Sequence, residues 1–335
     1  MRILQSMAWS DRTCKALNSE KKAFFKFTEE ADIPELPLTG DDLCLFAVWL
    51  WVVRGLKSPQ SVKSYLSAVR TMHRRIGLDC ATPTSYGPLG QIVAGLTRQS
   101  QHQVKKALPI TPTILNNLLQ SVPHNPQCRI QHQTLIVLKA AAQLLFQTMS
   151  RSSNMMPESR RKFDPSYLLK WNNIQRFPDG IIVTVTKSKT NQFGTNNHEI
   201  PVASSSVPRL CPVATLKSLA EMYGPQNLEP SSPVLLIPTQ SGTFVPLKKS
   251  EFVSWFRARI TEMGLPAGRF SVHSFRHGAI QQAVLNENNR ILVQLASGHA
   301  SDAVLGYALI PPERRFQLSR KINSSLAAAL QQNDD

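Results

Sequence analysis

The chain has 335 residues, enough for two domains, because domains typically contain about 100–200 residues. It carries 38 Lys and Arg against 22 Asp and Glu, a formal net charge of +16 at pH 7. This excess favours a polyanionic partner, with nucleic acid first and an anionic membrane surface second. The longest apolar run, residues 43–53, is far shorter than the roughly 20 residues that cross a bilayer, and no signal peptide pattern opens the chain. Membrane insertion and secretion are therefore not expected.

The cysteines give no sign of a metal site or a disulfide framework. There are five, an odd number, and none belongs to a C-x-x-C pair. They are Cys14, Cys44, Cys80, Cys128 and Cys211. The sequence also lacks a phosphate-binding G-x-x-x-x-G-K-[ST] loop. A reducing compartment is therefore expected, and the sequence gives no indication of a metal site or a nucleotide cofactor.

The N-terminal part reads as a small all-helical domain, which we place at residues 1–104. Its predicted helices cover residues 9–27, 41–54 and 58–77. The basic excess begins inside this domain, because residues 43–106 contain nine basic residues and one acidic residue. Ser58 is a plausible N-cap for the third helix, with Pro59 at the first helical position.

The third helix, 58–77, has two distinct faces. The apolar positions expected to face a core are Val62, Tyr65, Leu66, Val69 and Ile76. A second face carries Lys63, Ser67, Arg70 and Arg74, at spacings of three and four residues, so that consecutive members are neighbours on a helix. These cations could follow a phosphate backbone or enter a major groove; the alternative is a solvated basic face without a ligand.

A linker is predicted at residues 105–112, where the chain is polar and basic and then punctuated by proline. Lys105 and Lys106 are suited to contacting phosphate if two domains close around a duplex. The second domain is placed at residues 113–335.

The second domain is predicted to be mainly helical with a small β-hairpin. Helices are expected at 113–122 and 134–150, the latter apolar nearly all round and therefore buried. This buried helix ends next to Arg151, which would be costly to bury without an anion. Residues 180–203 read as two strands joined by a turn-rich loop. A last helix, 313–332, has the apolar stripe Leu318, Ile322, Leu326, Ala329 and Leu330.

Residues 271–307 hold the residue types needed to attack a phosphodiester. His273 and Arg276 share one face of a predicted helix, and His299 and Tyr307 follow in the chain. Guanidinium groups bind phosphate bidentately, imidazoles transfer protons, and a phenolic oxygen can form a covalent bond. Each residue alone has an ordinary structural explanation; their order is the informative feature.

This order resembles the active site of the tyrosine recombinases, the phage-integrase family, which runs Arg, Lys on a β-hairpin, His-x-x-Arg, His or Trp, then Tyr. The resemblance implies a two-domain C-shaped clamp with a helical core-binding domain, whose signature helix the phrase S-V-K-S-Y-L-S-A-V-R-T-M-H resembles. It matches Arg151 to the first catalytic arginine. It matches Lys189 to the hairpin lysine, with Lys187 as the competitor.

The resemblance also implies the roles of these residues. Arg151 and Arg276 would hold the scissile phosphate, with a third hydrogen bond from His299. His273 would act as general base and Lys189 as general acid to the leaving 5′ oxygen. Tyr307 would attack and form a 3′-phosphotyrosyl link.

Two departures from the family pattern stand out. Asn154 occupies the position, three residues after Arg151, where the family usually has an acid, so a charged supporting role is lost. Tyr307 follows His299 by eight positions, where nine is usual in the bacterial members of the family. The phrases S-R-S-S-N, S-K-T-N-Q-F-G and H-S-F-R-H-G look most like recombinases of eukaryotic mobile elements, the Crypton and DIRS-like groups.

The expected partners are double-stranded DNA and further copies of the chain, as a dimer or tetramer on DNA. The expected location is the nucleus in a eukaryote, or otherwise the cytoplasm with the nucleoid. Two alternatives remain open. One is a catalytically silent, domesticated DNA-binding regulator, and the other is a DNA relaxer similar to type IB topoisomerases.

Overall fold

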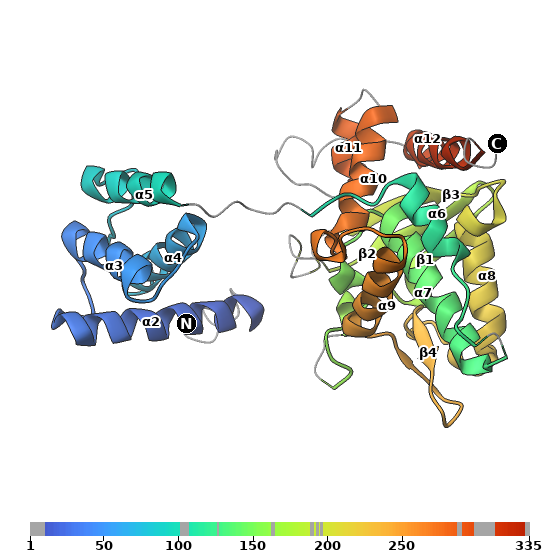
Figure 1. Ribbon diagram of the computed structural model, residues 1–335, viewed down its shortest axis with the longest axis horizontal. Helices are drawn as coiled ribbons and strands as arrows, with labels where there is room; N and C mark the ends of the chain where they lie inside the picture. Colours follow the sequence, from blue (N-terminus) through green and yellow to red (C-terminus); the bar gives the residue numbers. More distant parts are fainter. Residues whose placement is uncertain are drawn as a thin grey trace. The chain divides into compact units, whose positions relative to one another are not determined.

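The structure is a computed structural model that describes residues 11–100, 107–125, 127–161, 165–187, 191, 194, 197–286, 290–297 and 312–331. The chain divides into two compact units, Met1–Lys105 (unit 1) and Lys106–Asp335 (unit 2), both drawn in Figure 1. Helices predominate in the described residues, and unit 2 contains small antiparallel sheets, so the predicted fold class is confirmed. The site residues predicted outside the described ranges are Lys105, Lys106, Lys189, His299 and Tyr307.

Unit 1 is a helical bundle. Its helices are α2 (Asp11–Ala31), α3 (Gly40–Val52), α4 (Pro59–Arg75) and α5 (Gly87–Gln99). The three predicted helices are confirmed with shifted ends, whereas α5 was not predicted. Three glycines and a proline obscure α5 in the sequence, although Leu89, Val93 and Leu96 are buried at helical spacing.

Local sequence accounts for where these helices begin and end. Thr39 caps α3 by accepting a hydrogen bond from the Asp42 main-chain nitrogen at 3.2 Å, and Asp42 accepts one in return from the Thr39 main-chain nitrogen at 2.8 Å. Pro59 occupies the first turn of α4, as predicted. The prediction that Ile76 faces the core is wrong. Ile76 is 57% exposed because α4 ends at Arg75 and the Ile76 main chain leaves the helical conformation.

A buried histidine joins α4 to the segment before α3. The His73 side chain is fully buried, and its Nε2 accepts a hydrogen bond from the Leu38 main-chain nitrogen at 3.0 Å. Its Nδ1 lies 3.0 Å from the Val69 main-chain oxygen and must therefore carry the proton. The neutral ring thus satisfies two buried main-chain groups.

Unit 2 arranges helices around two small sheets. Its helices are α6 (Pro112–Gln120), α7 (Arg129–Gln147), α8 (Pro212–Tyr223), α9 (Lys249–Glu262), α10 (His273–Asn286), α11 (Arg290–Ser297) and α12 (Pro312–Gln331). One sheet has the order β1 (Ile174–Phe177), β2 (Gly180–Val185), β3 (His198–Ala203), and the other pairs β4 (Leu236–Pro238) with β5 (Phe244–Pro246). The predicted hairpin is confirmed as β2 and β3, which pair from Gly180 opposite Ala203 to Val185 opposite His198.

Helix α7 forms the centre of unit 2. It contacts α6, α8 and α10, and Leu144, Leu145 and Phe146 are fully buried, as its apolar sequence predicts (Figure 1). Its C-terminal end is therefore held from several sides. This is the end that leads into Arg151.

The residues predicted to form a linker belong largely to unit 2. The Leu108 main-chain nitrogen donates to the Arg269 oxygen at 2.8 Å, and the Ile110 nitrogen donates to the Ser274 oxygen at 3.0 Å. Ile110 is fully buried. Gly278 permits this contact, because a Cβ atom at that position would lie 2.0 Å from the Ile110 main-chain oxygen. The segment of residues 107–111 thus lies against the start of α10 and holds it in place; we call this segment the strap.

Helix α12 packs on its own unit, against β3, α10 and α6. Phe316, Leu318, Ile322 and Leu326 are buried there, which confirms the predicted stripe in its described part. Two polar side chains of α12 form hydrogen bonds with the main-chain nitrogen and oxygen of Ala203, at the edge of β3 that does not pair with β2. The Ala203 nitrogen donates to Ser319 Oγ at 2.6 Å, and Asn323 Nδ2 donates to the Ala203 oxygen at 2.9 Å.

Candidate active site

Arg151 is delivered by a sharp turn at the end of α7. Met149 has a φ of 50°, a left-handed conformation that is unusual for a residue with a side chain. This residue departs from the helical conformation just after the end of α7, and Arg151 then occupies the N-cap position of a short 3₁₀-helix, η1 (Ser152–Asn154). The Arg151 side chain is partly exposed, so it is available to a ligand.

Arg276 lies in the first turns of α10, and its guanidinium joins the ends of two other helices. The side chain is only 4% exposed. Nη1 donates to the Met149 main-chain oxygen, and Nη2 donates to the Ser297 oxygen, the last residue of α11, at 2.6 Å. The last carbonyl groups of a helix lack partners within the helix, and a cation is favoured at that end. Arg276 therefore fixes α7, α10 and α11 around one point.

A second positive charge lies beside this buried one. Burial lowers the pKa of Arg276 to about 10, and the neighbouring Arg151 contributes to the decrease. Two guanidinium groups that repel each other in a partly desolvated place are stabilised by an anion between them. The pair is therefore suited to hold a phosphate.

His273 faces the same charges. Its pKa is lowered from the usual value, first by burial and then by Arg276, His277 and Arg151. The imidazole is thus neutral near pH 7 before an anion arrives. A neutral imidazole can accept a proton, as a general base requires.

The β2–β3 hairpin begins next to this site. Asn154, at the end of η1, donates from Nδ2 to the Lys187 main-chain oxygen at 2.6 Å. The Lys187 ammonium lies over the Tyr167 ring, 5.7 Å from its centroid. The residues between Val185 and His198 join the two strands, and Lys189 belongs to them in sequence. The start of the loop that carries the predicted lysine is therefore anchored three residues from Arg151.

The structure brings together three of the six predicted catalytic residues: Arg151, His273 and Arg276. Lys189, His299 and Tyr307 lie outside the described residues. Sequence reasoning missed Met149 and Ser297, because each contributes a main-chain oxygen and no side-chain pattern reports such a role. Ser297 nevertheless stands two residues before His299 in the sequence.

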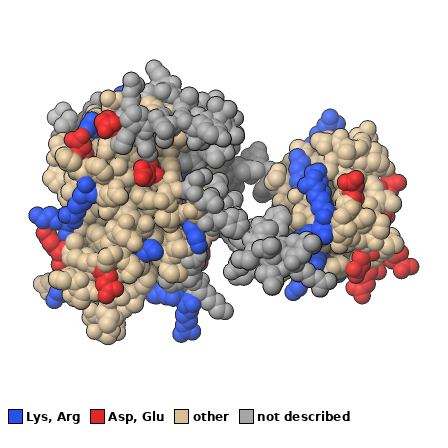
Figure 2. Space-filling model, turned by 180° about the vertical axis from the view of Figure 1, so that it is seen from behind, with Lys and Arg blue, Asp and Glu red and all other residues tan. Residues whose placement is uncertain are grey.

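The predicted DNA-binding residues of α4 lie on its outer side. Lys63 and Arg74 are exposed and Arg70 is partly exposed. Burial raises the pKa of the Cys80 thiol, while Arg70 and Arg74 act in the opposite direction, so both arginines lie near Cys80. Figure 2 shows Lys and Arg side chains in a band on one face of unit 1, with acidic side chains gathered toward another edge. A band of this kind matches the charge expected of a phosphate-binding surface.

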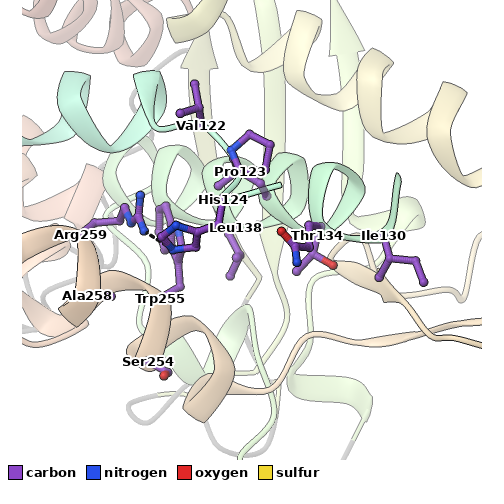
Figure 3. A pocket seen from close by; sticks show the side chains of 12 residues that line it. Val122, Pro123, His124, Ile130, Thr134, Leu138, Ser254, Trp255, Ala258 and Arg259 are labelled. Atoms are coloured by element: carbon purple, nitrogen blue, oxygen red, sulfur yellow. Dashed lines mark hydrogen bonds between the residues drawn. The ribbon is translucent and has the colours of Figure 1, made fainter. Parts of the chain in front are cut away.

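Another concavity of unit 2 contains none of the predicted residues. It is a groove of about 310 Å³ between α7, α9 and the segment before α7, lined by Ile130, Leu138 and Trp255 among others (Figure 3). One of its lining side chains, Arg259, donates from Nη2 to His124 Nε2 at 3.0 Å and also pairs with Glu262 at 2.6 Å.

Two further properties concern the described part of the chain alone. None of its helices is long and apolar enough to span a membrane. It also contains no group of three or more His, Cys, Asp or Glu side chains placed to hold a metal ion.

Comparisons with known proteins find similarity in structure only. No model of a protein family and no curated protein sequence matches the chain. Among solved structures, the XerH site-specific recombinase bound to a palindromic difH substrate matches with a TM-score of 0.56 and 16% identity over 95% of this chain and 78% of that chain. The Tn1549 transposon integrase in complex with transposon right end DNA matches with a TM-score of 0.53 and 14% identity, over 95% of this chain and 96% of that chain.

The lambda integrase (residues 75–356) bound to DNA gives a TM-score of 0.51 and 18% identity, over 90% of this chain and 89% of that chain. These proteins resemble the chain across both units, although few residues are identical. The chain therefore has the fold of the tyrosine recombinases and integrases.

Proposed function

We propose that the chain is a site-specific DNA recombinase that cleaves and rejoins DNA strands through a covalent bond to Tyr307. The observation that carries the proposal is the buried Arg276, whose charge lies beside that of Arg151 with His273 on the same helix. Such a site needs an anion, and the fold is that of proteins solved on DNA. A DNA phosphate is an anion that fits both the charge of the site and the fold of the chain.

In the proposed reaction the phenolic oxygen of Tyr307 attacks the phosphorus and passes its proton to the neutral His273. The bond between phosphorus and the 5′ oxygen breaks, the electron pair stays on that oxygen, and Lys189 supplies the proton. Arg151 and Arg276, with His299, stabilise the charge that builds on the non-bridging oxygens. Rejoining is the reverse, with a 5′ hydroxyl as the attacking group. The phosphoester is exchanged and not hydrolysed, so the reaction consumes no ATP.

We further propose that the chain moves a mobile element of the Crypton or DIRS-like kind in a nucleus, as a dimer or tetramer on DNA. Unit 1 would bind the duplex through Lys63, Arg70 and Arg74, and Lys105 and Lys106 would also contact phosphate. The exposed positions of Lys63 and Arg74 and the partly exposed position of Arg70 support this assignment.

The test is a covalent trap. The full chain is incubated with a library of nicked duplexes of randomised sequence, protein-linked DNA is recovered, and the attached peptide is identified by mass spectrometry. The expected result is a protease-sensitive adduct on Tyr307 that Tyr307→Phe abolishes. The matched control Tyr86→Phe removes a phenol of unit 1 that donates to Asp41 at 2.7 Å, and it should leave the adduct unchanged.

Each outcome assigns a function. DNA binding without an adduct would overturn the proposal in favour of a silent DNA-binding regulator. Relaxation of supercoiled plasmid without a preferred sequence would favour a topoisomerase-like enzyme. Adducts that share a common sequence, together with joining between two such sites, support the recombinase.

A further inference from the structure

Asn154 connects the turn that carries Arg151 to the strand that leads into the β2–β3 loop. Its side chain is 4% exposed, and its Nδ2 donates to the Lys187 main-chain oxygen at 2.6 Å. Its main-chain nitrogen donates to the Arg151 oxygen at 2.9 Å, and its own oxygen accepts from the Leu169 nitrogen at 2.8 Å. One buried residue thus ties three segments of unit 2 together.

Other contacts hold the same end of β2. Thr186 Oγ1 donates to the Ser166 main-chain oxygen at 3.2 Å, and Asn191 Nδ2 donates to the Thr186 oxygen at 2.9 Å. The Lys187 ammonium lies 5.7 Å from the centre of the Tyr167 ring. Among these contacts, the Asn154 amide is the one that reaches back to the Arg151 turn. It therefore fixes the start of the β2–β3 loop, at Lys187, relative to the turn that carries Arg151.

The chemistry of this bond requires an amide. The partner of Asn154 is a carbonyl oxygen, which can only accept a hydrogen bond. An ionised carboxylate is also an acceptor only, so Asp at this position would place a negative charge against a carbonyl oxygen inside the protein. A buried polar group that loses its donor is destabilised by about 1–3 kcal/mol. The acid of the family pattern is thus incompatible with this contact.

We propose that Asn154 is a positioning residue, which sets the β2–β3 loop relative to Arg151 so that the loop lysine can protonate the leaving 5′ oxygen. This inference rests on the proposed function. It has an unusual consequence, because restoring the acid found in the family pattern should impair this chain and not improve it.

The first experiment needs no DNA. Hydrogen–deuterium exchange of residues 186–198 is compared between the unchanged chain, Asn154→Asp and Asn154→Ala. Both substitutions should speed exchange in this segment, and Asp should do so more. The matched control is Asn227→Asp, because Asn227 Nδ2 also donates to a main-chain oxygen, that of Tyr223, at 3.0 Å, at the end of α8. Unchanged exchange in 186–198 for both Asn154 variants would overturn the inference.

The second experiment isolates the leaving group. Adduct formation is measured on a nicked duplex with the site recovered in the trap, and on the same duplex with sulfur replacing the bridging 5′ oxygen. A thiol has a pKa of about 8.5 and leaves as a thiolate without a proton donor. Asn154→Asp should lower the rate about 10²-fold on the oxygen substrate, the scale of general-acid catalysis, and far less on the sulfur substrate.

The outcomes are separable. An equal loss on both substrates would mean that Asn154 acts on folding or on phosphate binding, and the positioning role would be overturned. A full rate for Asn154→Asp on the oxygen substrate would overturn it as well. If the unchanged chain forms no adduct on either substrate, the proposed function fails, while the exchange experiment still decides whether Asn154 anchors the loop.

Discussion

The buried guanidinium of Arg276 donates a hydrogen bond to the main-chain oxygen of Met149, two residues before Arg151. This bond joins the two arginines of the candidate site through the backbone, although they are far apart in sequence. It also gives Arg276 a structural role as well as a chemical one. Substitutions there should therefore be visible both in stability and in chemistry.

Arg276→Lys tests both roles. A lysine ammonium is a compact charge that cannot reproduce the planar fork, so it cannot serve Met149, Ser297 and a phosphate together. We expect a stability loss of about 1–3 kcal/mol from the unsatisfied carbonyl groups and a fall in adduct formation of about 10²-fold or more. Denaturant unfolding and the covalent trap measure the two effects. Arg269→Lys, at an exposed position of the same unit, should change neither.

The lowered pKa of His273 predicts a dependence of stability on pH. The folded protein binds a proton at His273 less readily than the unfolded chain, because burial and the nearby arginines oppose the charge. Protonation of His273 therefore lowers the free energy of unfolding. This loss of stability is absent above the usual pKa of about 6.5 and is fully present below the pKa of His273 in the folded protein. His273→Asn should therefore raise the melting temperature relative to the unchanged chain at pH 5 more than at pH 8. A difference between the two proteins that does not change with pH would contradict the assigned electrostatics.

Gly278→Ala should severely destabilise unit 2. The added Cβ would lie 2.0 Å from the Ile110 main-chain oxygen, so either α10 or the strap must move. We expect a loss above about 3 kcal/mol, in the range of strong overpacking, measured by denaturant unfolding. Gly268→Ala is the matched control, because a Cβ there would meet nothing within 4 Å. Equal stability of the two variants would show that the contact is not closed in solution.

His73→Leu should destabilise unit 1. Leucine fills a similar volume but leaves the Leu38 main-chain nitrogen without its acceptor. The expected loss is about 1–3 kcal/mol. Thr71→Ala serves as the control on the same helix, since Thr71 Oγ1 donates only to the Ser67 oxygen of α4, at 2.9 Å. Thermal unfolding followed with a probe in unit 1 measures both variants.

Neutralising the face of α4 tests the DNA-binding assignment. Replacing Lys63, Arg70 and Arg74 by Gln should reduce the slope of log affinity against log salt concentration by about 3 if all three meet phosphates. Binding to duplex DNA is titrated at several salt concentrations. The same replacement of Lys21, Lys22 and Lys26 on α2 removes an equal charge at another place in unit 1 and should change the slope less. An unchanged slope for the α4 variant would place that face away from DNA.

The sequence predicted best where a pattern is local. Helix α7 and the β2–β3 hairpin were readable because a long apolar run and β-branched segments on either side of a turn-rich loop are local signals. Helix α5 was missed because its glycines and proline suggest a loop, and only tertiary packing of Leu89, Val93 and Leu96 makes it a helix. Ile76 was misplaced because the exact end of α4 depends on a cap geometry that composition does not specify.

The candidate site was predicted from the order of residue types along the chain. Such an order identifies side chains but not main-chain groups. It selected Arg151, His273 and Arg276 as candidates, and the structure places these three residues near one another. It could not identify the carbonyl groups of Met149 and Ser297, because every residue has one. It noted Asn154 as a departure from the family pattern but could not supply the partner, since the Lys187 oxygen lies 33 residues away along the chain.

The packing of α12 against β3 limits how copies of this chain can assemble. Ser319 and Asn323 occupy both hydrogen-bonding groups of Ala203, so β3 has no free peptide group there for a strand from another molecule. While α12 stays in place, a foreign strand therefore cannot pair with β3 at Ala203. Any arrangement in which α12 leaves must therefore provide Ala203 with a substitute donor and acceptor.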